Sequence, residues 1–320
     1  MMNFCVLGSG IAGSTIANLL SKKYSVHVFD KARGPGGRSS NKKFKKKLSF
    51  DHGVQYISPK SKVFKEFTQK LFKKKILKIW EGNHLDFTFE KKLDSKKYIG
   101  KKANNDLNKF NLKSIKQTFD SQIIKIKYKN KIWEITLKDN SKHHFQNLVI
   151  TCPFPQLKKI ARKYLDKKIL NLNVQMQPNI TVMVALKNQK NLPISSIKFN
   201  DDILAWAANE NSKNRFKSNI NLWTLQATLK WSKKTINKYK NNKSIMKQMV
   251  SRFVSLSGLD KNKIIHTGIH GWKYSYNYKK TPLLSYWSKK YKLGVCGDWF
   301  NGPKVENAWL SANNLAKKIK

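Results

Sequence analysis

Cysteine is scarce in this chain: Cys5, Cys152 and Cys296 are the only three among 320 residues. Each lies in or at the end of an apolar, strand-like run, and no CxxC pair or other metal-ligand spacing is present. Thiols in that setting are usually buried and reduced. The seven histidines add no metal-binding pattern, because their one adjacent pair lies in a polar hairpin without other ligands nearby. We therefore expect no bound metal.

Long apolar runs and an N-terminal leader are also missing. The longest hydrophobic stretches are far shorter than a membrane-spanning helix requires. The first residues lack a charged segment followed by the apolar core of a signal peptide. We expect a soluble, cytoplasmic protein with no membrane partner, and the length allows one large domain or two ordinary ones.

Acidic residues and arginine are both few. Lysine and arginine total 65 against 18 acidic residues, a net charge of +47, yet only five of the 65 are arginine. Such a charge commonly indicates a nucleic acid, an anionic membrane or a polyanionic substrate. Nucleic-acid surfaces, however, depend on arginine for bidentate and stacked contacts. Because lysine is scattered through every segment, we favour a solvated surface without a specific nucleic-acid or protein partner, and a polyanion site stays the alternative.

Glycine residues occur in a pattern that predicts a specific local structure. The apolar run "NFCVL" is followed by the turn "GSGIAG" and then by "STIANLLSKK", which has helical periodicity. A second apolar strand, "YSVHVFD", ends on Asp30, twenty residues after Gly10. This order predicts a dinucleotide-binding unit: Gly8 permits the tight turn, Gly10 lets a pyrophosphate approach, and Gly13 lets helix and strand pack closely. Asp30 is then the ribose-binding acid, or alternatively a solvated carboxylate at a strand end.

A second glycine cluster helps to identify the dinucleotide. The segment "KARGPGGRSS" contains Gly36, Gly37 and Arg38, and "FDHGVQY" follows at residues 50–56. An NAD-dependent dehydrogenase has no need of a second cluster directly after the ribose acid. In many flavoproteins this backbone lies close to the cofactor, and the planar guanidinium pairs with a phosphate. The alternative is a flexible basic loop.

The C-terminal segment has the same strand, acid and helix order. "KLGVCGDW" predicts a strand that ends at Gly297 and Asp298, and "GPKVENAWLSANNLAKKIK" predicts a helix with Pro303 in its first turn. Asp298 is suited to accept hydrogen bonds from ribityl or ribose hydroxyls. The helix start would face an anion, such as the charge that reduction places around N1 and the C2 carbonyl of a flavin. A capping aspartate before an ordinary terminal helix is the alternative.

Together these segments resemble the renalase-like branch of the FAD-dependent amine-oxidase superfamily. "AWAANENSKNR", "LWTLQATLKWS" and "HGWKYS" extend the resemblance through the middle of the chain, with Gly271 and Lys273 where relatives tend to carry arginine on the presumed substrate side. The resemblance implies FAD bound non-covalently, with the pyrophosphate at Gly8–Gly13, the isoalloxazine near residues 53–56, the adenine at Ile123 and the ribityl end at Asp298. The residues implied to contact FAD are Gly8, Ser9, Gly10, Ile11, Ala12, Gly13, Asp30, Lys31, Gly37, Arg38, Gly53, Gln55, Tyr56, Ile123, Gly297, Asp298 and Val305.

If both chain ends hold one cofactor, the domains must be interleaved. We predict an α/β fold, α+β overall, with a Rossmann-type FAD-binding lobe and a substrate lobe built on an antiparallel sheet. The FAD lobe takes residues 1–60, 118–160 and 286–320, and the substrate lobe takes 61–117 and 161–285. An amphipathic helix is expected at 61–79, with Val63, Phe64, Phe67, Leu71 and Phe72 on its apolar side. A hairpin and a returning strand are expected at 121–150, strands from 178, a helix at 243–256 and a further strand after it.

Aromatic residues mark a candidate substrate pocket. The candidates are Tyr56, Trp206, Trp272 and Tyr274. Large aromatics in an antiparallel sheet are more often core than pocket, so packing is the competing interpretation. For His270 we favour a hydrogen-bonded structural role over acid-base catalysis.

The implied chemistry is centred on the flavin, so no individual catalytic residue is predicted. A flavin accepts a hydride at N5 from a small reduced donor, and the protein orients the donor and excludes water. The resemblance implies reoxidation by dioxygen to hydrogen peroxide, with a dihydropyridine-nucleotide isomer favoured over an amine as donor. The alternatives are an amine oxidase or desaturase, an NAD-dependent dehydrogenase, and a non-enzymatic protein stabilised by FAD.

Overall fold

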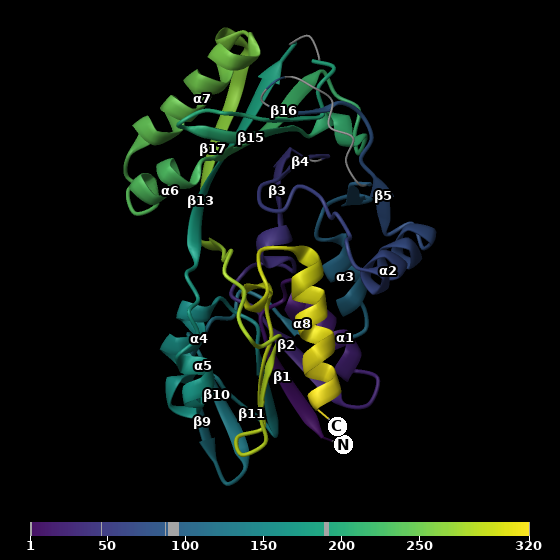
Figure 1. Ribbon diagram of the computed structural model, residues 1–320, viewed down its shortest axis with the longest axis vertical. Helices are drawn as coiled ribbons and strands as arrows, with labels where there is room; N and C mark the ends of the chain where they lie inside the picture. The colour runs from purple at the N-terminus through teal and green to yellow at the C-terminus, as the bar shows by residue number, and fades with distance from the viewer. Residues whose placement is uncertain (1, 46, 87, 89–95, 189–191, 320) are drawn as a thin grey trace.

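The protein has two sheet-based lobes. The computed structural model describes residues 2–45, 47–86, 88, 96–188 and 192–319. Figure 1 shows the lobe that contains both termini at the bottom and a second lobe, built on a large sheet, at the top. The fold class predicted from the sequence is confirmed, because a Rossmann-type parallel sheet is combined with a separate antiparallel sheet.

The lower lobe is organised by a sheet in which five parallel strands and one antiparallel edge strand have the order β18-β19-β12-β1-β2-β8. Its central strands are short, apolar and buried on both faces, as parallel strands require. β12 and β19 reach this sheet from the middle and the end of the sequence, so the lobe is discontinuous. The strands are β1 (Asn3–Leu7), β2 (Ser25–Phe29), β8 (Lys116–Thr118), β12 (Asn147–Ile150), β18 (Tyr286–Ser288) and β19 (Leu293–Val295).

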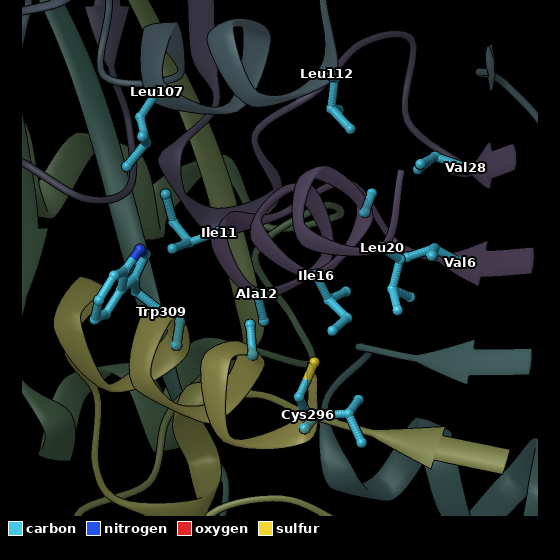
Figure 2. Close-up of a cluster of buried hydrophobic side chains, with 14 of the residues drawn as sticks. Val6, Ile11, Ala12, Ile16, Leu20, Val28, Leu107, Leu112, Cys296 and Trp309 are labelled. Carbon is cyan, nitrogen blue, oxygen red and sulfur yellow. The ribbon is translucent and has the colours of Figure 1, made fainter. Parts of the chain in front are cut away.

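Helices cover one face of this sheet. α1 (Ile11–Leu20) packs between α3 (Asp106–Leu112) and α8 (Val305–Lys318). Figure 2 shows Ile16 of α1, Leu107 of α3 and Trp309 of α8 in one cluster of buried side chains. The side chains of Phe64 and Leu71 from α2 (Lys62–Lys73) join the same cluster.

The other face of the parallel sheet is covered by β9 (Ile123–Lys129), β10 (Ile132–Leu137) and β11 (Lys142–Phe145), an antiparallel meander. α4 (Phe154–Ala161) and α5 (Lys167–Leu170) complete that layer. The expected hairpin at 121–150 therefore has a third strand, β11, and the expected returning strand is β12.

The upper lobe is a sheet of order β17-β13-β16-β15-β14-β6, antiparallel except for the β14–β6 pair. α6 (Leu229–Thr235) and α7 (Lys243–Ser257) pack on one face, and the hairpin β3–β4 packs on the other. A small two-stranded sheet, β5–β7, lies beside α2. The remaining bounds are β3 (Asn41–Lys45), β4 (Leu48–Asp51), β5 (Leu77–Ile79), β6 (His84–Leu85), β7 (Tyr98–Gly100), β13 (Gln177–Lys187), β14 (Ser196–Lys198), β15 (Leu204–Asn209), β16 (Ile220–Ala227) and β17 (Ile264–Tyr276).

Two sequence expectations are corrected. The helix expected at 61–79 ends at Lys73, and its apolar stripe was drawn too wide, because Val63 is 57% exposed and Phe72 is 43% exposed. Pro303 lies before α8, whose N-cap is Lys304, and so is outside the first turn. The domain boundaries stay a prediction; the packing of α2 and α3 shows only that both contact the helical face of the parallel sheet.

The remaining expectations about the chain as a whole have mixed outcomes. Cys5 and Cys296 are buried, Cys152 is half-buried, and all three thiols are free. Within the described residues, none of the helices has the length and apolar character that crossing a bilayer demands. The cytoplasmic location stays a prediction.

Candidate functional site

The first glycine turn joins β1 to α1 and is set by tight packing at two of its three glycines. Gly8 has φ +103°, and a Cβ atom there would lie 2.6 Å from Oγ1 of Thr151. A Cβ atom on Gly13 would overlap the carbonyl oxygen of Gly8. The fold itself therefore requires glycine at both positions, so that α1 can start directly against the end of β1.

Gly10 differs from these two because nothing in the protein crowds it. A Cβ atom there would have the Gly36 carbonyl oxygen 3.9 Å away and the Gly37 Cα atom 4.0 Å away as its nearest neighbours. The Gly10 φ of −66° is open to any residue. The amide of Gly36 donates to the carbonyl of Ser9 at 3.1 Å, so the second glycine cluster lies beside the first. The space at Gly10 is what a pyrophosphate would need to approach the start of α1.

Asp30 braces this turn from the end of β2. Its Oδ2 atom accepts hydrogen bonds from the Ser9 amide at 2.7 Å and the Ser9 hydroxyl at 2.6 Å. Its Oδ1 atom accepts from the Ala32 amide at 2.9 Å, while Lys31 between them is exposed. The carboxylate is therefore more than a solvated strand end, and its contact with a ribose stays a prediction.

The helix starts at this site lack side-chain caps. α2, α6 and α7 each have their first amides satisfied by the N-cap side chain, which is Ser61, Thr228 or Asn242. The N-caps of α1 and α8 are Gly10 and Lys304, and neither provides such a bond, which is also true of α3, α4 and α5. The amides and positive dipole ends at both starts are thus available to an anion. Val305 is the first residue of α8, and its contact with a cofactor stays a prediction.

The second and third motifs meet in an ion pair. Arg38 donates from Nη1 to Oδ2 of Asp298 at 2.8 Å and from Nη2 to Oδ1 at 2.5 Å. The Asp298 side chain is 7% exposed and that of Arg38 is 30% exposed. Gly297 is anchored beside it, since its amide donates to the Ser311 hydroxyl at 2.9 Å. Residues 260 positions apart are thereby joined, and the bonds predicted from Arg38 to phosphate and from ribityl hydroxyls to Asp298 stay predictions.

The turn after β4 packs onto the Arg38 backbone. A Cβ atom on Gly53 would overlap the carbonyl oxygen of Arg38, and that same oxygen accepts from the Val54 amide at 2.8 Å. Trp272 covers this turn from β17 by donating its indole N–H to the His52 carbonyl at 2.9 Å. Gly53, Arg38 and Trp272, predicted separately from the sequence, are therefore brought together.

The other predicted pocket residues, Tyr56, Trp206 and Tyr274, do not share one environment. The rings of Tyr56 and Trp206 have their centroids 6.1 Å apart, and Trp80 lies 6.3 Å from Tyr56. The indole nitrogen of Trp206 is buried and has no hydrogen-bond partner within the described part of the chain. Tyr274 lies two residues beyond Trp272 on β17, and the ring contact found for it is with the ammonium group of Lys273. Whether these side chains contact a substrate stays a prediction.

Gln55 is directed into its own turn. Its Nε2 atom donates to the carbonyl of Asp51 and, at 3.3 Å, to that of Gly53. Its Oε1 atom accepts from Nζ of Lys213 at 3.2 Å. The amide is thus fully engaged inside the protein, and any role of Gln55 toward a flavin passes through the turn that it holds.

Sequence reasoning missed a group of buried charges next to Gln55, which we call the buried ion cluster: Asp51, Glu210, Lys213 and Arg215. Their side chains are 0%, 1%, 0% and 4% exposed, respectively. Burial alone would raise the pKa of Asp51, but attraction and hydrogen bonds from Lys213 and Arg215 hold that pKa below its ordinary value. Burial raises the pKa of Glu210, against the attraction of Lys213. The sequence signal was present in "NENSKNR", where charges directly follow a buried strand.

Two histidines face each other beside this turn. The rings of His52 and His270 are 4.9 Å apart, and both contact Trp272. Burial, together with repulsion from His270, lowers the pKa of His52 to about 4. Burial and the cations Lys42 and Lys240 also lower the pKa of His270. Both rings are therefore neutral at pH 7.

Gly271 corrects one expectation drawn from the resemblance. It pairs with Ile180, whose side chain packs in the core beneath α6 and α7, and a Cβ atom on Gly271 would overlap the ring of Tyr239. This glycine therefore faces the helices and is away from the side of the sheet that meets His52 and Gly53. Tyr239 fills the space into which a larger residue would project.

The remaining predicted contact, Ile123, is the buried first residue of β9. A shallow hollow of about 310 Å³ opens beside it, next to Ser121, whose amide donates to the Asp30 carbonyl at 2.9 Å. No group of three or more potential metal ligands occurs among the described residues. The hollow is lined by Asp120, Ser121, Gln122, Leu137, Lys138 and Asp139.

Comparison with known proteins agrees with this geometry. Residues 6–71 match the family profile of the NAD(P)-binding Rossmann-like domain. A protein from Exiguobacterium sp. 255-15, provisionally named protoporphyrinogen oxidase, superposes with a TM-score of 0.74 at 9% identity, over 99% of this chain and 98% of its own. The chain therefore shares the overall fold of this protein and contains a Rossmann-like domain of the NAD(P)-binding type.

Two further solved structures extend the same likeness. An oxidoreductase from Methanosarcina mazei gives a TM-score of 0.70 at 11% identity, over 99% of this chain and 100% of its own. A protein from Pyrococcus furiosus gives 0.65 at 12% identity, over 99% and 97%. The shared fold therefore extends over nearly the whole chain, and the renalase-like branch stays a prediction.

Proposed function

We propose that this protein is an oxidoreductase that binds FAD non-covalently. One observation carries the proposal: three segments distant in the sequence, at residues 8–13, 36–38 and 297–298, converge around the uncapped start of α1, where only Gly10 is uncrowded. A pyrophosphate accounts for the space, and Asp30, Arg38 and Asp298 are polar groups suited to a ribose, a phosphate and a ribityl chain.

Different segments would contact different parts of the cofactor. Amides at the starts of α1 and α8 would stabilise negative charge, and the Gly53 turn with Trp272 would orient the ring system and exclude water. When bound, FAD supplies a hydride acceptor at N5, and reoxidation by dioxygen yields hydrogen peroxide. Neutral His52 and His270 add no positive charge to the donor side at pH 7.

The test of cofactor identity is direct. The purified protein should be yellow or should become so when titrated with FAD, and mass spectrometry of the released cofactor should identify FAD. Titration with NAD separates the main rival, because an NAD-dependent dehydrogenase would use the first glycine turn and leave the Arg38–Asp298 pair without a task. A folded protein that stays colourless and ignores added FAD would contradict the proposal.

For the reaction we propose, as in the renalase-like branch, a small reduced donor, with a dihydropyridine-nucleotide isomer favoured. The basic surface suits a phosphate-bearing donor. An anaerobic screen should compare nicotinamide isomers, amines and protoporphyrinogen, the last because of the name of the Exiguobacterium protein. Flavin bleaching identifies the donor, and peroxide release on admitting air tests the acceptor. Bleaching by amines alone would favour the amine-oxidase alternative.

A further inference from the structure

The buried ion cluster has an energetic cost that its stability contribution does not explain. Removing two acids and two bases from water is expensive, and apolar side chains of similar volume commonly serve the core as well or better. Lys213, in the loop before β16, nevertheless has a side chain with 0% exposure that contacts Asp51 at the end of β4. What such a cluster supplies is a fixed geometry, because its side chains hold one another through hydrogen bonds that are shielded from water.

Every ammonium proton of Lys213 has an acceptor. Nζ lies 2.9 Å from Oδ2 of Asp51, 2.9 Å from Oε2 of Glu210 and 3.2 Å from Oε1 of Gln55. Asp51 is the last residue of β4, and Gln55 is at the far side of the turn that follows. Lys213 therefore holds both sides of this turn from the upper lobe.

The turn transmits that placement to the candidate cofactor site. With its oxygen on Lys213, the Gln55 amide must point its nitrogen at the carbonyls of Asp51 and Gly53. The Gly53 backbone in turn packs against the Arg38 carbonyl, without room for a Cβ atom. Arg38 then carries the bidentate bond to Asp298.

We propose that Lys213 is a positioning residue for the cofactor: through Gln55 it fixes the 51–56 turn against Arg38 in the geometry that receives FAD. The inference rests on the proposed function for its ligand. The position of the turn itself can be measured without any cofactor.

The experiment uses a charge-balanced variant, Lys213→Met with Glu210→Gln, which removes one cation and one anion together. Its matched control is Lys230→Met with Asp202→Asn, an ion pair of 3.1 Å whose side chains are 85% and 83% exposed. Hydrogen exchange of the backbone amides of residues 51–56 is measured on the FAD-free proteins. FAD affinity and thermal unfolding are measured on the same preparations.

We expect exchange in 51–56 to rise and FAD affinity to fall, each about tenfold, the factor that corresponds to about 1.4 kcal/mol. The control pair should match the wild type in both. Exchange and affinity at wild-type values in the charge-balanced variant would overturn the proposal, whatever its melting temperature. If the wild type itself ignores FAD, the proposed function fails, and the exchange data alone decide the role of Lys213.

A second variant decides the matter if the first does not fold. Gln55→Glu keeps an acceptor for Lys213 but loses both donors to the backbone carbonyls of the turn. Its control is Gln117→Glu, since Gln117 likewise donates to two carbonyls, those of Leu112 and Ile115. Faster exchange in 51–56 in Gln55→Glu, but not in Gln117→Glu, supports the proposal. Wild-type exchange in 51–56 in Gln55→Glu refutes it.

Discussion

At the residue scale, the three glycines of the first turn have different reasons to be glycine. Gly8 and Gly13 are demanded by contacts within the protein, with Thr151 and with each other. A Cβ atom on Gly10 would meet Gly36 and Gly37 only at ordinary van der Waals distances. A motif that the sequence presents as one pattern therefore separates into glycines that packing requires and one that packing does not require.

This separation gives a prediction for alanine at two positions. Gly13→Ala should lower the free energy of unfolding by about 1–3 kcal/mol or more, because the methyl group overlaps backbone. Gly10→Ala should cost less than about 1 kcal/mol, the difference between two residues at an N-cap, yet weaken FAD binding. Denaturant unfolding and FAD titration measure the two effects. Equal loss of affinity and stability in both variants would show that the glycines share one structural role.

His52 gives a pH prediction at the same scale. An unfolded histidine titrates near 6.5, whereas burial holds the pKa of His52 at about 4, so the unfolded chain binds the proton first. The contribution of His52 to stability is complete above pH 6.5 and is lost as the pH falls toward 4, by up to about 3 kcal/mol. His52→Phe should therefore flatten the fall in unfolding free energy over that range.

The control for this prediction is His144→Phe, since the His144 side chain is 60% exposed. It should keep the wild-type dependence on pH. His27, whose pKa is also lowered to about 4 by burial, is present in all three proteins and sets a shared background. A wild-type slope in His52→Phe would mean that His52 does not titrate in this range.

At the element scale, α8 is attached to α2 as well as to the parallel sheet. The Glu306 carboxylate accepts from the amides of Lys60 and Ser61, both at 2.8 Å, immediately before α2 begins. Trp309 packs on Phe64 and Phe67, with ring centroids 5.4 and 4.9 Å away. α8 is thus held by polar bonds at one turn and aromatic contacts at the next.

Glu306→Gln should loosen this attachment. One of the two backbone amides would then face the side-chain amide nitrogen of the variant, which cannot accept a hydrogen bond. Hydrogen bonds to charged groups contribute about 1.5–3 kcal/mol each. We expect a loss of that order in the free energy of unfolding, while Glu66→Gln, at an exposed position on α2, should change it little. Urea unfolding compares the two, and equal stabilities would show that the Glu306 bonds exchange freely with water.

What the sequence could predict also divides at this scale. The strand, turn and helix at each end are local patterns, so their elements were recognisable from neighbouring residues. The buried ion cluster was not, because Asp51 and Lys213 are 162 residues apart and only the packing of β4 under the upper sheet joins them. The stripe expected on α2 failed for a related reason: Val63 and Phe72 are apolar, but the fold leaves them 57% and 43% exposed, and the ring of Phe72 meets Tyr98 only at its edge.

At the scale of the whole molecule, the surface carries a charge of one sign. A net charge of +47 with few acidic residues leaves most lysines repelling one another. Screening by salt should therefore stabilise the folded state, and the melting temperature should rise from about 0.01 M to about 0.15 M NaCl, as the Debye length falls from about 30 to about 8 Å. A melting temperature that falls with salt would indicate that attractive ion pairs dominate.

The discontinuity of the parallel sheet has a consequence for biosynthesis. Domains generally fold from the N-terminus as the chain is made, but β12 has no partner on one side until β19 emerges, and Arg38 has none at Asp298. The nascent protein therefore exposes an unpaired edge of β12 until β19 has been translated. Flavin loading would then follow translation, and premature stop codons in this last stretch should yield insoluble, cofactor-free fragments.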